Sequence, residues 1–348
     1  MASDTSSGHA SDIEGVDLAA LAAWMDSAGL GSGPITDTEL LVGGTQNILL
    51  RFTRDGRDYV LRRPPVHKRA NSDETMRREM RVLGALAGSD VPHPGLIAAC
   101  PTEDVLGAAF YLMEPVAGVN PSEDLPERYR TDPEWREGLG FSMVDGIAAL
   151  SRVDHVARGL ADFGRSENWI ARQVGRWRKQ LDSYADVPKY PGPSLPHVEE
   201  VSAWLTEHQP TECRLGLVHG DAHIANVLVS RDEPRVAAFV DWELATIGDV
   251  RLDLGHMIAT WPGRPGTVAK VEIPGLPEPD ALVARYAESA GREVHDIEWF
   301  VVLACYRLGI ILEGSWARML AGQTTAEVGE RLGAMGRALF EQAHEITG

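Results

Sequence analysis

The sequence is short of cysteine and of positive charge, and each shortage excludes a class of protein. Its 348 residues include three cysteines that lie far apart and form no C-x-x-C pair, so neither a disulfide framework nor a structural metal site is expected. Arginine and lysine number 33 against 51 acidic residues, and the formal charge of −18 argues against nucleic acid or an anionic membrane as a partner. The negative charge either keeps the protein soluble or draws cationic substrates towards a cleft.

Long apolar runs are also missing. The longest, near residues 300–312, is interrupted by Arg307 and is too short to span a bilayer. The polar N-terminus shows no cationic segment followed by an apolar one, so no secretory signal is expected. Because the cysteines also indicate a reducing compartment, these features together predict a cytoplasmic protein. Residues 1–15 are rich in serine, aspartate and glycine and are expected to be disordered.

The segment at residues 215–255 has the features of a catalytic hairpin. Two short apolar runs flank a polar turn that contains a proline, which predicts an antiparallel pair of strands. Antiparallel pairing brings Asn226, before the first strand, beside Asp241, after the second, and Asp221 lies on the preceding loop. Amide and carboxylate oxygens suit a hard cation, and a further carboxylate could take the proton of a hydroxyl. The pattern is typical of a phosphoryl-transfer site.

This segment resembles the catalytic core of the aminoglycoside phosphotransferase and choline kinase family. The residues that carry the resemblance are His219-Gly220-Asp221, Asn226 five positions after the aspartate, and Asp241. That family shares the protein-kinase fold but phosphorylates small molecules, and the likeness extends from about residue 40 to the C-terminus. It therefore implies an ATP-dependent kinase that transfers the γ-phosphate to the hydroxyl group of a small molecule.

The resemblance also implies an architecture. We expect an α+β, bilobal protein-kinase-like fold, with the nucleotide bound between a small β-rich N-lobe and a large, mainly helical C-lobe. The N-lobe would occupy residues 16–118 and end in a connector. The C-lobe, with the catalytic loop and the acceptor site, would occupy residues 119–348. The sequence does not indicate an oligomeric state.

The resemblance assigns roles to the residues of the catalytic segment. Asp221 would orient and deprotonate the acceptor hydroxyl, and Asn226 and Asp241 would hold Mg²⁺. ATP or GTP would be the phosphoryl donor. Glu243 is either a second metal carboxylate or a turn residue. The residues expected to brace the catalytic loop are His219 and Asp253.

The expected nucleotide site draws on the N-lobe. Strands and turns alternate over residues 40–63, with a two-residue hairpin signal at Asp55-Gly56. A glycine pair at the first turn can bring backbone amides close to phosphates, although no G-x-G-x-x-G motif is present. The loop residues that resemble a nucleotide-covering loop are Gly44, Thr45 and Asn47. The connector residues expected to hydrogen-bond the adenine edge through their backbone are Glu114 and Val116.

An arginine replaces the lysine that the family usually places on its third strand. Either Arg62 or Arg63 could fork onto phosphate oxygens there. Glu79 lies in the buried stripe of a helix expected at residues 71–87 and needs a partner, for which Arg62 is the candidate. The run of two arginines and two prolines is similar to that of kinase-like domains fused to some acyl-CoA dehydrogenases.

The acceptor is not indicated by the sequence. An amphipathic helix expected at residues 168–181 carries Arg172 and Arg176 on a basic stripe, which is either a solvated face or a site for an anionic substrate such as a coenzyme A ester. Tyr306 is a possible substrate contact, with a structural role as the alternative. Aminoglycosides would need an acidic acceptor pocket and hydroxyacyl-CoA esters a basic one. A catalytically silent nucleotide-binding scaffold is the alternative from a different class.

Overall fold

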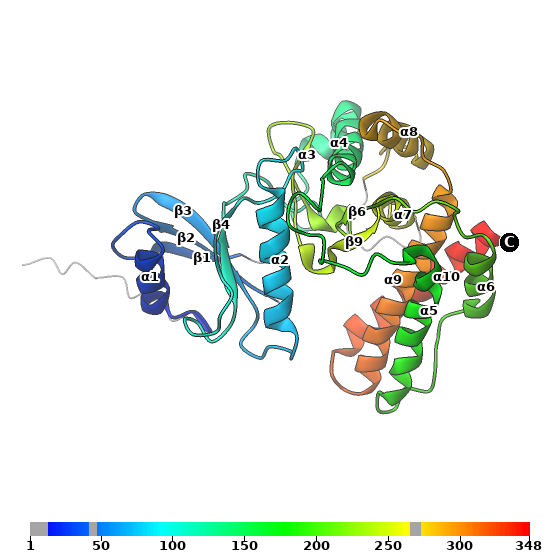
Figure 1. The fold of residues 1–348 in the computed structure, drawn as a ribbon, viewed down its shortest axis with the longest axis horizontal. Coiled ribbons are helices and arrows are strands. Elements are labelled where there is room, and N and C mark those ends of the chain that lie inside the picture. The colour runs from blue at the N-terminus through cyan, green and yellow to red at the C-terminus, as the bar shows by residue number, and fades with distance from the viewer. Residues whose placement is uncertain (1–12, 42–46, 265–272) are drawn as a thin grey trace, which may run out of the picture. The chain divides into compact units, whose positions relative to one another are not determined.

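The computed structural model describes residues 13–41, 47–264 and 273–348, and the chain forms two compact units. The first unit comprises residues 1–84 and 94–115, and the second comprises residues 85–93 and 116–348 (Figure 1). Across the described residues, no helix has both the length and the apolar character that a bilayer crossing requires.

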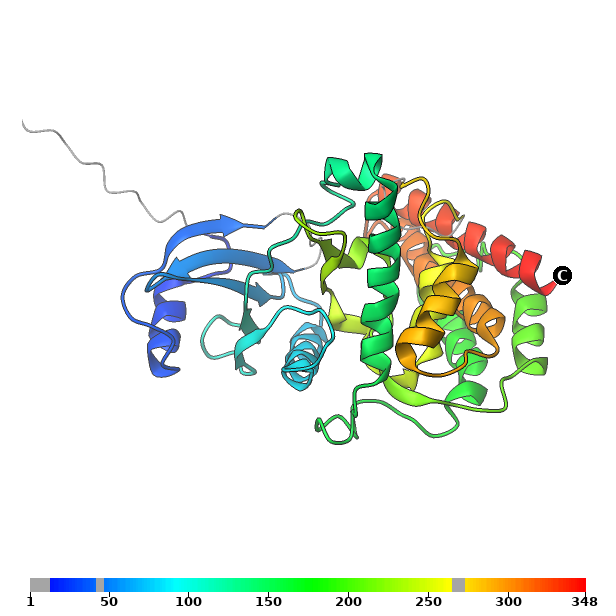
Figure 2. The same ribbon diagram turned by 90° about the horizontal axis from the view of Figure 1, so that it is seen from above.

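The first unit is built on one antiparallel sheet of five strands in the order β1-β2-β3-β5-β4 (Figures 1 and 2). The strands are β1 (Thr36–Leu40), β2 (Ile48–Arg54), β3 (Arg57–Arg63), β4 (Leu96–Cys100) and β5 (Phe110–Met113). Two helices accompany the sheet, α1 (Leu18–Ser27) and α2 (Ser72–Leu86). Leu61 of β3 shares a buried core with Met25 of α1, whereas the next residue, Arg62, contacts α2. Because adjacent strand residues face opposite sides, the two helices cover opposite faces of the sheet.

The hairpin predicted at Asp55-Gly56 is confirmed. Both residues have positive φ, 51° and 71°, and the flanking Arg54 and Arg57 pair across β2 and β3. Positive φ at both central residues is what a two-residue turn needs to match the twist of the strands.

Two edge strands differ from expectation. The first strand ends at Leu40 instead of beginning there, and the sequence analysis missed β4 altogether. The strand β1 is mostly exposed and polar, with the sequence TDTEL, so no apolar alternation marks it. An edge strand pairs on one side only and needs less apolar surface than a central one.

The second unit is mainly helical, with two short antiparallel strand pairs. Its helices are α3 (Glu127–Thr131), α4 (Pro133–Ser151), α5 (Trp169–Asp182), α6 (Val198–Glu207), α7 (Arg251–Ala259), α8 (Pro279–Ala290), α9 (Ile297–Leu320) and α10 (Ala326–Thr347). The strand pairs are β6 (Leu215–Val218) with β9 (Thr246–Asp249), and β7 (Val227–Val229) with β8 (Val236–Phe239). The small sheet of the first unit and the helices of the second confirm the α+β class.

Helix α9 is the centre of the second unit and packs against both α7 and α10 (Figure 1). Most of its residues are buried. Helix α7 approaches it closely at Gly255, where a Cβ atom would lie 2.6 Å from the backbone of Phe300. The absence of a side chain at this position thus sets the distance between α9 and α7.

Candidate active site

The strand pair β7–β8 brings the two expected metal ligands to one end. Val227 pairs with Phe239, and one residue further out the Val240 amide donates to the carbonyl oxygen of Asn226 at 2.9 Å. The chain continues directly from Val240 into Asp241. The predicted hairpin is therefore present, with Asn226 and Asp241 at its open end.

The side chain of Asn226 connects the hairpin to Asp221. Its Nδ2 donates to the Asp221 carboxylate oxygen Oδ2 at 2.9 Å and to the Asp221 carbonyl oxygen at 3.0 Å. Within the described residues no hydrogen bond engages its other atom, Oδ1, so that oxygen can serve as a ligand. Asp241 has a left-handed backbone, with φ 65°, a conformation that is uncommon outside glycine and that concentrates at functional sites. The oxygen donors here fit a small hard cation such as Mg²⁺.

Two histidines that the sequence analysis did not single out hold the carboxylate of Asp221. His256 Nε2 lies 3.1 Å from Oδ1, and His223 Nε2 lies 3.5 Å from Oδ2. Burial raises the pKa of Asp221, but the charge and hydrogen bonds of His223 and then His256 outweigh it and hold that pKa well below the usual value. Asp221 is therefore ionised at neutral pH. Its side chain is still 23% exposed, so a substrate can reach it.

These three residues form a compact group of potential metal ligands. One ligand atom from each of Asp221, His223 and His256 lies within 4.8 Å of the others. Imidazole nitrogens suit zinc and other transition metals, whereas Mg²⁺ prefers oxygen ligands, so Asn226 and Asp241 remain the better magnesium candidates. His223 stands two residues after Asp221 and could have been noticed in the sequence. His256 comes from α7, and only the tertiary structure brings it to the site.

Asp253 braces the backbone just before Asp221. Its Oδ2 accepts from the His219 amide and its Oδ1 from the Gly220 amide, both at 2.8 Å. Burial raises the pKa of Asp253 to about 6, even though these two N–H groups favour the carboxylate. The His219 ring is fully buried and contacts the carbonyl oxygen of Val240 through Nε2 at 3.0 Å. The contacts of both residues are those of loop supports.

Replacing Gly220 by alanine is expected to destabilise the protein by about 1–3 kcal/mol, since two costs combine. The residue has φ +80°, and a Cβ atom would lie 2.4 Å from the carbonyl oxygen of Leu244. Chemical denaturation followed by circular dichroism measures the change. In the control, Gly175→Ala, the new Cβ on helix α5 has nothing within 4 Å and should stabilise the protein by about 0.5–1 kcal/mol. Equal effects of the two substitutions would contradict the steric argument.

His219 is expected to make the protein less stable in acid. Burial lowers the pKa of His219 from 6.5 to about 4, so between these values the unfolded chain binds more protons than the folded one. This contribution is complete above pH 6.5 and is lost as the pH falls towards 4, by up to about 3 kcal/mol. Urea unfolding at a series of pH values measures it.

The matched variant for this experiment is His219→Gln, which keeps a donor but does not titrate. The stability difference between the two proteins should shrink as the pH falls through the window, while Asp253, present in both, affects both curves alike. Parallel curves for wild type and variant would show that His219 does not titrate in that range.

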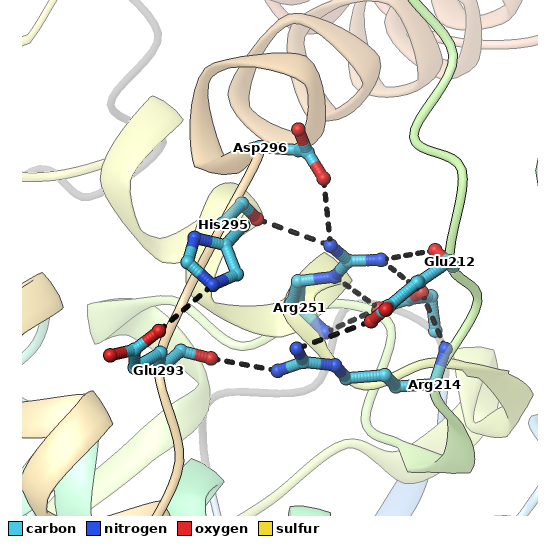
Figure 3. A network of polar contacts seen from close by, with 7 residues as sticks. Glu212, Arg214, Arg251, Glu293, His295 and Asp296 are labelled. Carbon is cyan, nitrogen blue, oxygen red and sulfur yellow. Dashed lines mark hydrogen bonds and ion pairs between the residues drawn. The ribbon is translucent and has the colours of Figure 1, made fainter.

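A buried ion pair of Arg251, whose polar contacts are drawn in Figure 3, fixes the start of helix α7, which carries Asp253 and His256. Arg251 donates through Nε and Nη2 to the two carboxylate oxygens of Asp249, at 2.9 and 2.8 Å, and both residues are almost fully buried. The same guanidinium reaches the carbonyl oxygens of Glu212 and His295 and the carboxylate of Asp296. It thereby ties the end of β9 to the segment before β6 and to the start of α9.

In the first unit, Arg62 rather than Arg63 pairs with Glu79. Arg62 Nε and Nη2 lie 2.9 and 3.1 Å from the two carboxylate oxygens, and the Tyr111 hydroxyl donates to Glu79 at 2.7 Å. Arg62 is 7% exposed and Glu79 is 1% exposed. Arg63 Nε instead donates to the carbonyl oxygen of Pro64 at 3.0 Å. The strand–helix pair suggested by the sequence is therefore present.

The remaining residues expected at the nucleotide site are less defined. Gly44 and Thr45 lie outside the described residues, and Asn47 is half-buried just before β2. The Glu114 amide donates to the carbonyl oxygen of Gly95 at 2.8 Å, so it is not available to a nucleotide. The carbonyl oxygen of Val116 accepts from the Gly118 amide at 2.9 Å.

The three residues expected at the acceptor site have different environments in the structure. Arg172 donates to the carbonyl oxygens of Glu167 and Arg165, so it stabilises the loop before α5. Arg176 is exposed. Tyr306 is fully enclosed at 0% exposure, and burial raises its pKa to about 12, so its expected role as a direct substrate contact is not supported. On a helix that is buried almost all round, such as α9, sequence periodicity does not tell a binding side from a packing side.

Comparison with known proteins identifies the family. The phosphotransferase enzyme family matches residues 37–296. Acyl-CoA dehydrogenase family member 10 from Mus musculus is 28% identical over 302 residues, which are 84% of this chain but 27% of the mouse protein. The chain thus spans about a quarter of that relative's length.

Solved structures of similar fold support the same family assignment. A protein from Ralstonia eutropha JMP134, provisionally named an aminoglycoside phosphotransferase, is 30% identical, with a TM-score of 0.77 over 94% of this chain and 98% of that one. A thermostable mutant of aminoglycoside phosphotransferase APH(4)-Ia, in a ternary complex with AMP-PNP and hygromycin B, is 14% identical, with a TM-score of 0.57 over 92% of this chain and 98% of that one. The predicted protein-kinase-like fold is confirmed, and so is the resemblance to aminoglycoside phosphotransferases. The chain belongs to the phosphotransferase enzyme family.

Proposed function

We propose that this protein transfers the γ-phosphate of a nucleoside triphosphate, ATP or GTP, to the hydroxyl group of a small molecule. The observation that carries the proposal is the arrangement around Asp221. This ionised, accessible carboxylate is fixed by two histidines and by Asn226, whose free amide oxygen lies at the same hairpin end as Asp241. Support for a nucleotide donor comes from the structural neighbour that binds AMP-PNP.

Asp221 would act on the acceptor hydroxyl. The hydroxyl oxygen forms a bond to the γ-phosphorus while the bond from that phosphorus to the leaving ADP oxygen breaks, and the hydroxyl proton passes to Asp221 and then to water. A carboxylate with so low a pKa is a weak base, so it would take the proton late in the reaction. Its main contribution is then to orient the hydroxyl, as suits a loose phosphoryl-transfer transition state.

The other residues would bind Mg²⁺ and the phosphates or support the loop that carries Asp221. Asn226, through Oδ1, and the Asp241 carboxylate would hold Mg²⁺, which neutralises charge on the phosphates when bound. Arg62, held in place by Glu79, would contact phosphate oxygens, because a guanidinium forks onto them as a lysine does not. His219 and Asp253 would keep the loop that carries Asp221 in place.

An ADP-release screen of the purified protein with Mg²⁺ and ATP tests the proposal. The acceptors should include aminoglycosides, choline-like alcohols and hydroxyacyl-CoA esters. Hydroxyacyl-CoA esters are the second candidate, since the relatives include a protein named as an acyl-CoA dehydrogenase. Asp221→Ala serves as the control and should abolish acceptor-dependent ADP release.

Two outcomes would contradict the proposal in different ways. A signal that survives Asp221→Ala would show that the base is misassigned. Tight nucleotide binding without ADP release, for every acceptor tested, would favour a catalytically silent scaffold.

A further inference from the structure

Arg307 is a buried cation that forms no ion pair within the described residues. It lies in the middle of α9 with only 5% of its surface exposed. Its Nη1 is enclosed and has no hydrogen-bond partner among the described residues. A guanidinium carries five N–H donors and is always charged, so enclosing it without acceptors is costly unless something else supplies them. This arginine is therefore a candidate for ligand binding rather than packing.

A second orphaned donor lies beside it. The Arg307 guanidinium carbon is 5.5 Å from the ring centroid of Trp177 on helix α5, and the indole Nε1 of Trp177 is also enclosed without a partner in the described part of the chain. Arg176 adds a further positive charge, 4.8 Å from the centroid of the same indole ring. Guanidinium and indole nitrogens can only donate hydrogen bonds. An anion with several acceptor oxygens would satisfy the enclosed donors of Arg307 and Trp177, and the exposed Arg176 would add to its attraction.

This group of donors is close to the catalytic carboxylate. Helix α9, which carries Arg307, packs against α5, which carries Trp177, and against α7, whose His256 Nε2 lies 3.1 Å from Asp221 Oδ1. Burial lowers the pKa of Arg307, and the negative charge of Asp221 opposes that shift. All of these residues belong to the second unit. A small molecule whose hydroxyl meets Asp221 would therefore extend towards the helices that carry Arg307 and Trp177.

We propose that the acceptor alcohol carries a carboxylate or phosphate group, and that Arg307 and Trp177 bind this group while the hydroxyl meets Asp221. This inference rests on the proposed kinase function and narrows its substrate class. It disfavours aminoglycosides, which are polycations, because Arg176 and Arg307 would repel them. It also moves the anion site away from Arg172, whose guanidinium is occupied by backbone oxygens, to the buried Trp177 of the same helix.

The competing explanation is that Arg307 only balances charge. Its attraction to Asp221 and Asp253 could keep both carboxylates ionised without any contact to a substrate. In that case its removal would shift the pH profile of turnover but would not change the preference between charged and neutral acceptors. The experiment must therefore compare acceptors that differ only in charge.

Binding is measured by calorimetry without nucleotide, using 3-hydroxybutyrate and its methyl ester, glycerol 3-phosphate and glycerol, and kanamycin. Wild type should bind each anion at least tenfold more tightly than its neutral partner. Arg307→Gln should weaken anion binding by roughly 10- to 100-fold, the equivalent of one charge-assisted contact. Trp177→Phe, which keeps the ring and removes the donor, should weaken it by roughly 3- to 10-fold. The control Arg178→Gln, on the exposed side of α5, should have no effect.

Several results would overturn the inference of an anion site. Equal binding of charged and neutral partners, or a charge preference that survives Arg307→Gln, would overturn the inference. So would inorganic phosphate binding as tightly as the hydroxy compounds, since the site would then hold a free anion. If Arg307→Gln does not fold, the wild-type preference and Trp177→Phe decide. Anion binding that depends on Arg307, with no ADP release from any acceptor, would refute the kinase function but leave the anion site standing.

Discussion

Asp221→Asn is expected to reduce kcat by about 10³-fold while leaving the KM for ATP within about threefold of wild type. The substitution keeps the size of the side chain but removes the charge that, in the proposed mechanism, orients the hydroxyl group and accepts its proton. It also places an amide opposite His256 Nε2, which now contacts Asp221 Oδ1 at 3.1 Å. Steady-state ADP release with the acceptor found in the screen measures both constants.

The matched control is Asp232→Asn, an exposed carboxylate in the turn of the same hairpin. It should leave both constants unchanged, because the side chain of Asp232 makes no contact with the site. A loss of less than tenfold for Asp221→Asn would show that another group takes the proton. A rise in the KM for ATP equal to the fall in kcat would place Asp221 in nucleotide binding instead.

The parts of the site that sequence reasoning reached share one property. The position of each of these residues follows from a short sequence pattern, such as strand alternation or helix periodicity. Asn226 and Asp241 lie at the same end of the hairpin because antiparallel pairing sets Val227 opposite Phe239. Glu79 pairs with Arg62 because helix periodicity turned a carboxylate inward and strand alternation turned one arginine towards it. In both cases the spacing of residues along the chain determines the side of the strand or helix on which a side chain lies.

What sequence reasoning missed depends on packing between distant elements. His256 reaches Asp221 because α7 packs on α9, at a distance set by Gly255, and no period of the sequence encodes that distance. Arg307 interrupts an apolar run and was, like Tyr306, a possible substrate contact, but only the packing of α5 against α9 brings Trp177 to it. Tyr306 was a possible substrate contact with a structural role as the alternative, and the packing of α9 against α10 encloses it. When a helix is buried on all sides, its hydrophobic periodicity does not show which side chains bind a ligand and which only pack.

Arg251→Met is expected to destabilise the protein by about 3–5 kcal/mol, the cost typical of removing one partner from a buried ion pair. The remaining carboxylate of Asp249 has 0% exposure and would keep the backbone donors of residue 251 and Arg214 and the thiol of Cys213, but no cation as its direct partner. For a unit of this size the loss corresponds to a fall in Tm of roughly 10 °C. Methionine fills most of the volume next to Phe300, so the effect reports on charge and hydrogen bonds more than on a cavity.

Arg214→Met is the control for this prediction, because it removes a neighbouring arginine that is more exposed than Arg251. The Arg214 side chain is 25% exposed and donates to the carbonyl oxygen of Glu293 at 2.7 Å (Figure 3), so its loss should cost about 1 kcal/mol or less. Differential scanning calorimetry of the two variants compares them directly. Because Arg251 fixes the start of α7, its replacement should also lower kcat through Asp253 and His256, whereas Arg214→Met should not. Equal, small changes in Tm for both variants would mean that the Arg251–Asp249 pair contributes no more than a surface contact.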